Sequence, residues 1–356
     1  MKKSLRIGID MAATAGQKSG LGFYVEHIVS ALHALPGNHE LVELHRVKKN
    51  LRTPQRILWD QIGVPLSFLN KKIDVLFTPA FSAPRFPKPV VMTAHDIFGI
   101  IHPDRFSGAA AYYWTKLLPR SFKRAEQLIC VSEYTKKTIV DYLHIDESKL
   151  QVVPLAAGKE FRVLDDVEGI KKSLHEMKIT TPFILSVGTL EPRKNFARLI
   201  EAFAFTKRGE TKLVIVGKKG WEYAEIFETI RKYHMQETVI ILDYITQEQL
   251  VALYNACLFF IMPSLFEGFG LPALEAMNCG APVAVAQNTS LPEVTGEAGV
   301  LFDPYDVQSI RARLDLLLQN NQLRQEMQQK SFRHAQQFSW EQTATATLSI
   351  IERVVG

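Results

Sequence analysis

Short apolar runs alternate with longer amphipathic stretches along most of the chain. A short apolar run bounded by turn residues is typical of a buried strand, and an apolar stripe with a helical period is typical of a helix. In the first half the pattern predicts strands at 5–10, 41–47, 74–79, 90–96, 127–132 and 151–155, and helices at 22–35, 56–69, 109–125 and 134–143. This alternation predicts a parallel sheet that is covered by helices.

The second half repeats the pattern after a break. Strands are predicted at 183–188, 212–217, 239–242, 258–263, 282–286 and 299–302, and helices close the chain from Asp306 onward. Residues 156–180 are charged and weakly periodic, and we expect a linker there. The fold class predicted is α/β, with two doubly wound domains in tandem. Such sheets bind ligands at the carboxyl ends of their strands, so we expect an active site in a cleft between the domains.

Length and composition agree with this organisation. A chain of 356 residues with 47% hydrophobic residues exceeds the size of most single cores. No apolar run reaches the roughly 18–20 residues that a membrane span needs. The start, MKKSLRIGID, lacks the apolar region of a secretory signal. Cys130, Cys257 and Cys279 stand apart in apolar surroundings, so we expect buried thiols and a cytoplasmic protein.

The net charge of +5 is unevenly divided. Residues 1–174 carry 25 Lys and Arg against 17 Asp and Glu, whereas residues 175–356 carry 17 against 20. A basic first half suits an anionic partner such as a phosphate, a nucleotide or an anionic lipid. No nucleic-acid motif is present, so nucleic acid is not predicted as a partner.

Residues 105–124, RFSGAAAYYWTKLLPRSFKR, mix aromatic and basic side chains. An interfacial helix in contact with lipid has this composition, and so does an ordinary amphipathic helix with a basic face. Pro119 should bend or end the helix.

Two loops of the first half carry candidate chemistry. Gly16, Gly20 and Gly22 follow the first strand, where glycines either let the backbone approach a phosphate at a helix N-terminus or form a plain flexible loop. His95 and Asp96 follow the fourth strand. They are explained by a structural His–Asp contact or a helix cap, or by an imidazole that binds a sugar hydroxyl.

The turn VGTLEPRKN, residues 187–195, is more specific. The strand ends at Gly188, and Arg193 and Lys194 stand side by side before the next helix. Adjacent cations repel each other unless they are solvated or share an anion. The guanidinium fork and the ammonium charge together suit a diphosphate. Asn195 is predicted to cap the helix that follows.

The segment PSLFEGFGLPALE, residues 263–275, places Glu267 eight positions before Glu275. The glycines between them permit close approach, Pro272 fits the first turn of a helix, and Gly280 fits its end. Carboxylates at both ends and amides between them match the ribose, diphosphate and sugar of a nucleotide sugar. In the alternative interpretation Glu275 only favours the helix dipole and Glu267 is solvated.

The segments GTLEPRKN and EGFGLPALE together resemble glycosyltransferase family 4 with its E-x7-E motif. The resemblance extends over nearly the whole chain through GLGFY, AHD and VSEYTKK, and is nearest to bacterial mannosyltransferase-like members of polysaccharide biosynthesis. It implies a GT-B fold, in which two Rossmann-like domains face each other across a cleft. The acceptor domain would be residues 1–165, joined by a helix near 340–356, and the nucleotide-sugar-binding domain residues 175–338.

The resemblance implies a retaining, metal-independent transfer of a hexose, with mannose and the donor GDP-mannose favoured, and no cofactor. The acceptor would be a saccharide or a lipid-linked saccharide, which adds peripheral contact with an anionic membrane. Arg193 and Lys194 would hold the diphosphate, Glu267 the donor sugar, Glu275 the ribose, and His95 the sugar from the first domain. The remaining donor-binding positions implied are Gly20, Gly22, Gly188, Gly268, Phe269, Gly270 and Leu271.

Other functions share this fold. A sugar-nucleotide 2-epimerase would use the same donor without an acceptor. A phosphorylase would need a lysine site for its cofactor, which the sequence does not reveal. A non-catalytic nucleotide-sugar-binding subunit is disfavoured, because Arg193, Lys194, Glu267 and Glu275 are all present.

Overall fold

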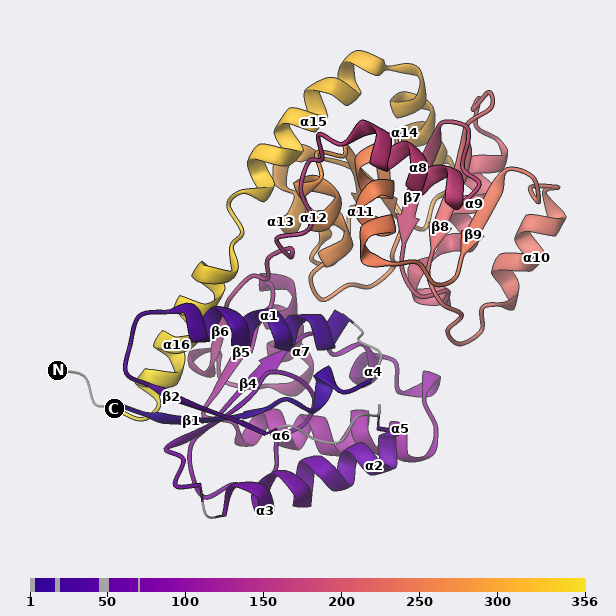
Figure 1. Ribbon diagram of the computed structural model, residues 1–356. Helices are drawn as coiled ribbons and strands as arrows, with labels where there is room; N and C mark the ends of the chain where they lie inside the picture. The colour runs from indigo at the N-terminus through magenta and orange to yellow at the C-terminus, as the bar shows by residue number, and fades with distance from the viewer. Residues whose placement is uncertain (1–3, 17–19, 45–50, 70) are drawn as a thin grey trace. The chain divides into compact units, whose positions relative to one another are not determined.

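The computed structural model describes residues 4–16, 20–44, 51–69 and 71–356. The chain forms two compact units (Figure 1). The first contains the residues up to Ala156 together with Phe338–Gly356, and the second is Ala157–Gln337. Residues 157–165 lie in the second unit, where the Leu164 amide donates to Asn255 Oδ1 at 2.8 Å.

The first unit contains a parallel sheet with the strand order β2-β1-β3-β4-β5-β6. Its strands are β1 (Arg6–Asp10), β2 (Glu40–Leu44), β3 (Val75–Thr78), β4 (Val90–Ala94), β5 (Gln127–Cys130) and β6 (Leu150–Val152). Its helices are α1 (Gly20–Ala34), α2 (Thr53–Leu58), α3 (Val64–Phe68), α4 (Phe98–Ile101), α5 (Gly108–Tyr112), α6 (Leu118–Arg124), α7 (Glu133–Leu143) and α16 (Trp340–Arg353). The predicted strand 41–47 corresponds to β2, and its last three residues lie outside the described residues.

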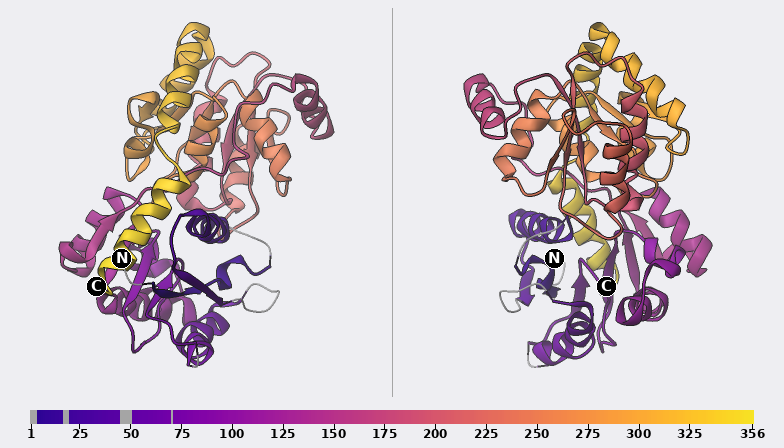
Figure 2. Two further views of the ribbon diagram at one scale, coloured as in Figure 1. Left: turned by 60° about the vertical axis from the view of Figure 1, so that its left-hand side comes forward. Right: turned by 90° about the vertical axis from the view of Figure 1, so that its right-hand side faces the viewer.

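Helices cover both faces of this sheet. On one face, buried side chains of α3, α6 and α7 pack with Leu76, Met92 and Leu128. The helices α1 and α16 contact each other, and the Tyr24 hydroxyl of α1 lies 2.9 Å from Thr93 Oγ1 of β4. Figure 2 shows α16, in yellow, within the first unit in both views.

Two helical stretches of this unit each contain a π-helical turn. The turn η2 (Trp59–Gly63) joins α2 to α3 just before Pro65, and η4 (Tyr113–Leu117) joins α5 to α6 just before Pro119. Proline lacks an amide hydrogen and clashes with the carbonyl one turn earlier, so a wider turn lets the helix continue. The helix therefore does not end at Pro119, and of the two expectations only a bend remains.

The second unit contains a second parallel sheet with the order β12-β11-β10-β7-β8-β9. Its strands are β7 (Phe183–Val187), β8 (Lys212–Val216), β9 (Val239–Leu242), β10 (Phe260–Met262), β11 (Val283–Ala286) and β12 (Gly299–Phe302). Its helices are α8 (Val167–Glu176), α9 (Phe196–Ala204), α10 (Ala224–Lys232), α11 (Gln247–Ala256), α12 (Leu271–Asn278), α13 (Leu291–Thr295), α14 (Val307–Gln319) and α15 (Asn321–Ala335).

This strand order is that of a doubly wound sheet, with its switch point between β7 and β10. Phe260 of β10 pairs with Leu185 of β7, and the chain leaves the two strands in opposite directions across the sheet. Right-handed crossovers then place the following helices on opposite faces, so a crevice forms between the two strand ends. The prediction of two α/β, doubly wound parallel sheets is confirmed.

One predicted linker contains a helix. Within residues 156–180, α8 begins at Val167, and the side chain of its N-cap residue Asp166 accepts from the Gly169 amide at 2.9 Å. Its side chains are exposed or partly buried, and Ile170 and Leu174 are among the partly buried ones on a helix that contacts α11. Residues 167–176 of the expected linker are therefore helical.

The three cysteines are free thiols and buried, as predicted. Over the part of the chain that the structure describes, no helix is both long and apolar enough to cross a bilayer.

Candidate active site

The turn after β7 is fixed to the end of β10. A short 3-10 helix, Pro192–Lys194, presents the two cations, and Asn195 follows with a left-handed φ of 60°. Asn195 stands at the N-terminal boundary of α9, but its side chain does not cap that helix, contrary to the prediction. Its amide instead donates to the carbonyls of Pro263 at 3.0 Å and Pro304 at 2.8 Å. Asn195 therefore anchors the turn that carries Arg193 and Lys194, which we call the cation turn, to the end of β10.

The loop after β10 requires glycine at Gly270. Its φ of 105° is strained for other residues, and a Cβ there would lie 2.5 Å from Leu291 Cδ2. The Ser290 hydroxyl lies 3.1 Å from the Glu267 carbonyl and 2.8 Å from the Phe269 carbonyl, so it holds the loop from the side of β11. Pro272 occupies the first turn of α12, as predicted.

The two loops meet in a buried ionic cluster. Lys194 Nζ lies 2.5 Å from Glu267 Oε1, and both residues are less than a tenth exposed. Arg193 Nη1 lies 3.4 Å from Glu267 Oε2 and donates to the Phe266 carbonyl at 2.9 Å. Arg193 Nη2 is 2.8 Å from Glu191 Oε1. The anion that the adjacent cations share in this structure is thus the Glu267 carboxylate.

The electrostatics of this cluster favour an ion pair. Burial disfavours the charge on Glu267, but Lys194 and Arg193 outweigh it, and the pKa of the carboxyl lies below its usual value. Burial outweighs the attraction of Glu267 at Lys194, so the pKa of the ammonium is also below its ordinary value. An ammonium has three donors and Glu267 takes one of them, so Lys194 can serve a second acceptor.

Glu275 has a different environment. It lies in the second turn of α12 and accepts a hydrogen bond from the Tyr254 hydroxyl at 3.0 Å. Burial raises the pKa of Glu275 to about 7. The two glutamates of the motif therefore have separate partners and titrate in different ranges.

The first-unit candidates belong to a different part of the molecule. His95 Nε2 lies 2.8 Å from the Pro79 carbonyl, and the Tyr24 ring meets the imidazole edge-on at 4.6 Å. Burial lowers the pKa of His95, so the neutral ring donates from Nε2 and keeps Nδ1 as an acceptor. The Asp96 carboxylate accepts from the Phe98 amide at 3.0 Å, two residues further on, while Ile97 occupies the N-cap position of α4 without a side-chain cap.

The predicted glycines of the first unit lie at the start of α1. Gly20 is the first residue of that helix and is exposed, and Gly22 is buried in its first turn. Loop residues 17–19 lie outside the described residues. Gly188 lies beside the Lys194 side chain, since a Cβ added to it would be 3.2 Å from Lys194 Cδ.

The structure thus brings together Arg193, Lys194 and Glu267 from two loops of the second unit. Sequence reasoning did not assign roles to Glu191, Tyr254 or Ser290. Glu191 lies two residues before Arg193, so the charge pattern of the turn could have indicated that the two side chains pair. Tyr254 and Ser290 come from α11 and from the loop after β11, and no local pattern marks them.

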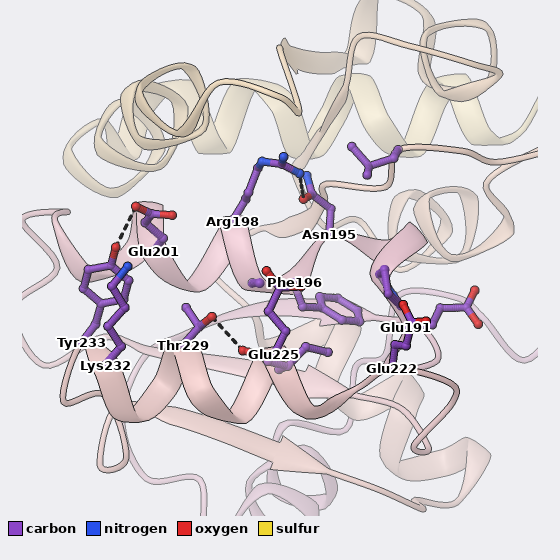
Figure 3. A pocket seen from close by; sticks show the side chains of 14 residues that line it. Glu191, Asn195, Phe196, Arg198, Glu201, Glu222, Glu225, Thr229, Lys232 and Tyr233 are labelled. Carbon is purple, nitrogen blue, oxygen red and sulfur yellow. Dashed lines mark hydrogen bonds between the residues drawn. The ribbon is translucent and has the colours of Figure 1, made fainter. Parts of the chain in front are cut away.

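A cavity of about 400 Å³ lies between α9 and α10, next to the cation turn (Figure 3). Its acidic lining residues outnumber its basic ones, with Glu191, Glu201, Glu222 and Glu225 against Arg198 and Lys232. Glu201 accepts from the Tyr233 hydroxyl at 2.7 Å, and Arg198 donates to Asn195 Oδ1 at 2.9 Å. An acidic lining disfavours a diphosphate, so we place the candidate anion site at Arg193 and Lys194.

Solved structures with the same fold include glycosyltransferases of the GT-B class. WaaG, a glycosyltransferase of lipopolysaccharide biosynthesis, superposes with a TM-score of 0.77 at 16% identity, over 97% of this chain and 99% of that one. HepE of Anabaena, solved in complex with UDP and glucose, gives a TM-score of 0.76 at 16% identity, over 98% and 100%. At this level of identity the likeness shows the fold.

Sequence comparisons identify the family. Residues 170–334 match the model for glycosyl transferases group 1, and residues 19–157 the model for Glycosyltransferase Family 4. The O-antigen chain mannosyltransferase B of Escherichia coli is 30% identical over 312 residues, which is 87% of this chain and 79% of that enzyme. The chain belongs to glycosyltransferase family 4.

Some relatives are much longer than this chain. The serotype-specific mannosyltransferase WbdA of Escherichia coli is 31% identical over 288 residues. That match covers 78% of this chain and 35% of WbdA, so the chain spans about a third of that relative.

Proposed function

We propose that this chain transfers a hexose, with mannose as the first candidate, from a nucleotide-diphosphate sugar to a saccharide acceptor. The observation that carries the proposal is the buried cluster of Arg193, Lys194 and Glu267 at the β7–β10 switch point, with Glu275 on the helix that follows. The mannosyltransferase names of the relatives favour mannose and polysaccharide synthesis, and we take GDP-mannose as the donor to test first.

Each group has a role in this proposal. Arg193 and Lys194 bind the diphosphate and stabilise the charge that develops on it as the bond to the sugar breaks. Glu275 accepts hydrogen bonds from the ribose hydroxyls, and Glu267 contacts the donor sugar while it fixes Lys194. Gly188 and the backbone of residues 268–271 bind sugar or phosphate oxygens.

The transfer proceeds with retention and without a metal ion. Two cations next to the diphosphate can offset its charge, and this supports the metal-free part of the proposal. A double displacement needs a nucleophile at the anomeric carbon, and the site suggests none. We therefore favour a front-side transfer in which the leaving phosphate assists deprotonation of the acceptor.

The first unit is the acceptor domain in this proposal, and it also supplies contacts to the donor. His95 Nδ1, an acceptor in the neutral ring, suits a hydroxyl of the donor sugar, and Gly20 and Gly22 lie where a helix start could face a donor phosphate. The acceptor is a growing saccharide, free or lipid-linked, and the lipid-linked form entails peripheral contact with an anionic membrane surface.

A donor screen tests the proposal. The chain is incubated with GDP-mannose, UDP-glucose or ADP-glucose, with and without a mannoside acceptor, and products are followed by mass spectrometry. We expect an acceptor-dependent gain of one hexose from GDP-mannose that persists in EDTA, and NMR should show that the anomeric configuration is retained. Nucleotide release without an acceptor and without a glycoside product would indicate the epimerase alternative, and no turnover together with nucleotide binding would indicate a non-catalytic subunit.

A further inference from the structure

A short segment at the start of the second unit is fastened along α11. Residues 158–164, which we call the strap, precede α8 and belong to the second unit. The Gln247 side chain, at the first residue of α11, donates to Glu160 Oε1. Near the other end of α11, the Asn255 side chain donates to the Arg162 carbonyl at 3.0 Å. The strap is therefore held at both ends of this helix.

The strap also contacts the hydrogen-bond partner of Glu275. Phe161 meets the Tyr254 ring edge-on, with ring centroids 5.9 Å apart, and both residues are buried. The Tyr254 hydroxyl donates to Glu275 Oε2 at 3.0 Å. Glu160 precedes Phe161 in the chain, and its carboxylate folds back over Gly158, because a Cβ on that glycine would clash with Glu160 Oε1. The strap thus brings a second carboxylate to the helix that holds Glu275 in place.

Two side chains outside α12 affect the charge of Glu275 in opposite ways. Burial raises the pKa of Glu275, the Tyr254 hydrogen bond lowers it, and the charge of Glu160 raises it, to give about 7. Burial also raises the pKa of the nearby thiols, to about 12 for Cys257 and further for Cys279, so both are neutral. The helices α13 and α15 also contact α12, but among the charged groups of the described residues Glu160 is the one that shifts the pKa of Glu275.

The charge of Glu275 matters for the ribose contact that it makes in the proposed function, on which this inference rests. Hydrogen bonds to an ionised acceptor are about twice as strong as those to a neutral one. The ribose is common to nucleoside diphosphates, so the inference does not depend on the base or the sugar of the donor.

We propose that the strap and α11 are part of the donor site, with Tyr254 and Glu160 as positioning residues that act on the ribose through Glu275. Tyr254 fixes the Glu275 carboxylate and favours its ionised form. Glu160, which Gln247 and the strap hold at the start of α11, opposes that ionised form. Neither residue needs to touch the nucleotide, because each acts by changing how well Glu275 accepts from the ribose hydroxyls.

Carboxyl NMR of the full chain tests this effect without a nucleotide. The glutamate side-chain carboxyl carbons are labelled, and the Glu275 signal is assigned from its loss in Glu275→Gln. We expect the titration midpoint of Glu275 to lie below the native one in Glu160→Gln and above it in Tyr254→Phe. Glu160→Asp keeps the charge and should restore the native midpoint. The matched control Glu168→Gln removes a charge from an exposed position of α8 and should leave the midpoint unchanged.

Calorimetry tests the consequence for the nucleotide, with whichever of GDP, UDP and ADP binds the native chain most tightly. The affinity of each variant is divided by the native affinity at the same pH, so that titration of the nucleotide phosphates cancels. Glu160→Gln should bind about two- to fivefold more tightly than the native chain near pH 6, because more of Glu275 is ionised, and about equally near pH 8.5. Tyr254→Phe should bind at least about threefold more weakly near pH 7. A purely structural role of Glu160 would weaken binding at every pH.

The two measurements separate this inference from the proposed function. A Glu275 midpoint that stays native in Glu160→Gln and Tyr254→Phe, or that moves in the same direction in both, would overturn the inference. Weaker binding of the nucleotide by Glu160→Gln near pH 6 would also overturn it. A native chain that binds none of the three nucleotides would instead contradict the proposed function, and the NMR midpoints would still decide whether the strap controls the charge of Glu275. Thermal melts establish that each variant is folded.

Discussion

Replacing Lys194 with methionine should destabilise the second unit. The substitution keeps much of the side-chain volume but leaves Glu267 buried, with Arg193 Nη1 at 3.4 Å as its remaining cation. Removal of one partner from a buried ion pair costs about 3–5 kcal/mol, and the residual contact with Arg193 places this case near the lower value. For a unit of about 180 residues, 1 kcal/mol corresponds to about 2–4 °C, so the melting temperature should fall by about 9 °C.

The same substitution should change how stability depends on pH. In the native chain the pKa of Glu267 is lowered, so its stabilising contribution is present above the ordinary carboxyl pKa and is lost as the pH falls through the folded value. Without Lys194, burial should raise that pKa, and the variant should lose stability as the pH rises. The difference in melting temperature between the two proteins should therefore widen from acid to neutral pH.

Scanning calorimetry across this pH range measures both effects. Lys137→Met, at an exposed position, serves as the control and should melt like the native chain. The double variant Lys194→Met with Glu267→Leu should recover part of the loss, because it leaves no unpaired charge. Equal melting temperatures and parallel pH profiles for Lys194→Met and the native chain would refute the reasoning.

Three further predictions concern single residues. Nucleotide affinity measured by calorimetry should fall as the pH drops through about 7, where Glu275 becomes protonated, and Glu275→Gln should remove this dependence; a native profile that stays flat would contradict the assignment. Gly270→Ala should lower the stability of the second unit by about 2–3 kcal/mol in thermal melts, because φ is 105° and the new Cβ would meet Leu291; an unchanged melting temperature would show that the loop is not constrained. His95→Gln should lower kcat at least about tenfold and leave nucleotide affinity unchanged, and a matching loss of affinity would place His95 elsewhere in the mechanism.

The sequence predicted the sheets well because their strands are buried on both faces. Continuous apolar runs such as residues 183–188 and 212–217 are typical of strands that are covered on both faces, so the sequence assigns them to a buried parallel sheet. The helix at residues 167–176 was missed because charged residues dominate this segment, although Val167, Ile170 and Leu174 recur with a helical spacing after the N-cap residue Asp166. The helix continues through Pro119 because a π-helical turn precedes it, and the sequence alone does not reveal that turn.

The candidate site was predicted in its components but not in its pairings. Both Arg193–Lys194 and Glu267 could be singled out from local patterns, but their contact depends on β7 and β10 being neighbours, which is a property of the strand order. Asn195 illustrates the limit of local rules, since its amide binds carbonyls of two distant loops instead of the helix beside it. The Tyr254 partner of Glu275 comes from another helix in the same way.

Calorimetric titration with GDP is the most direct test that the second unit binds the nucleotide of a sugar donor through the proposed residues. The account predicts saturable binding to the native chain, at least about tenfold weaker binding by Lys194→Ala and by Glu275→Ala, and native affinity in the control Lys330→Ala. Parallel melts establish that each variant is folded at the temperature of the titration. Native affinity in both Lys194→Ala and Glu275→Ala would contradict the account.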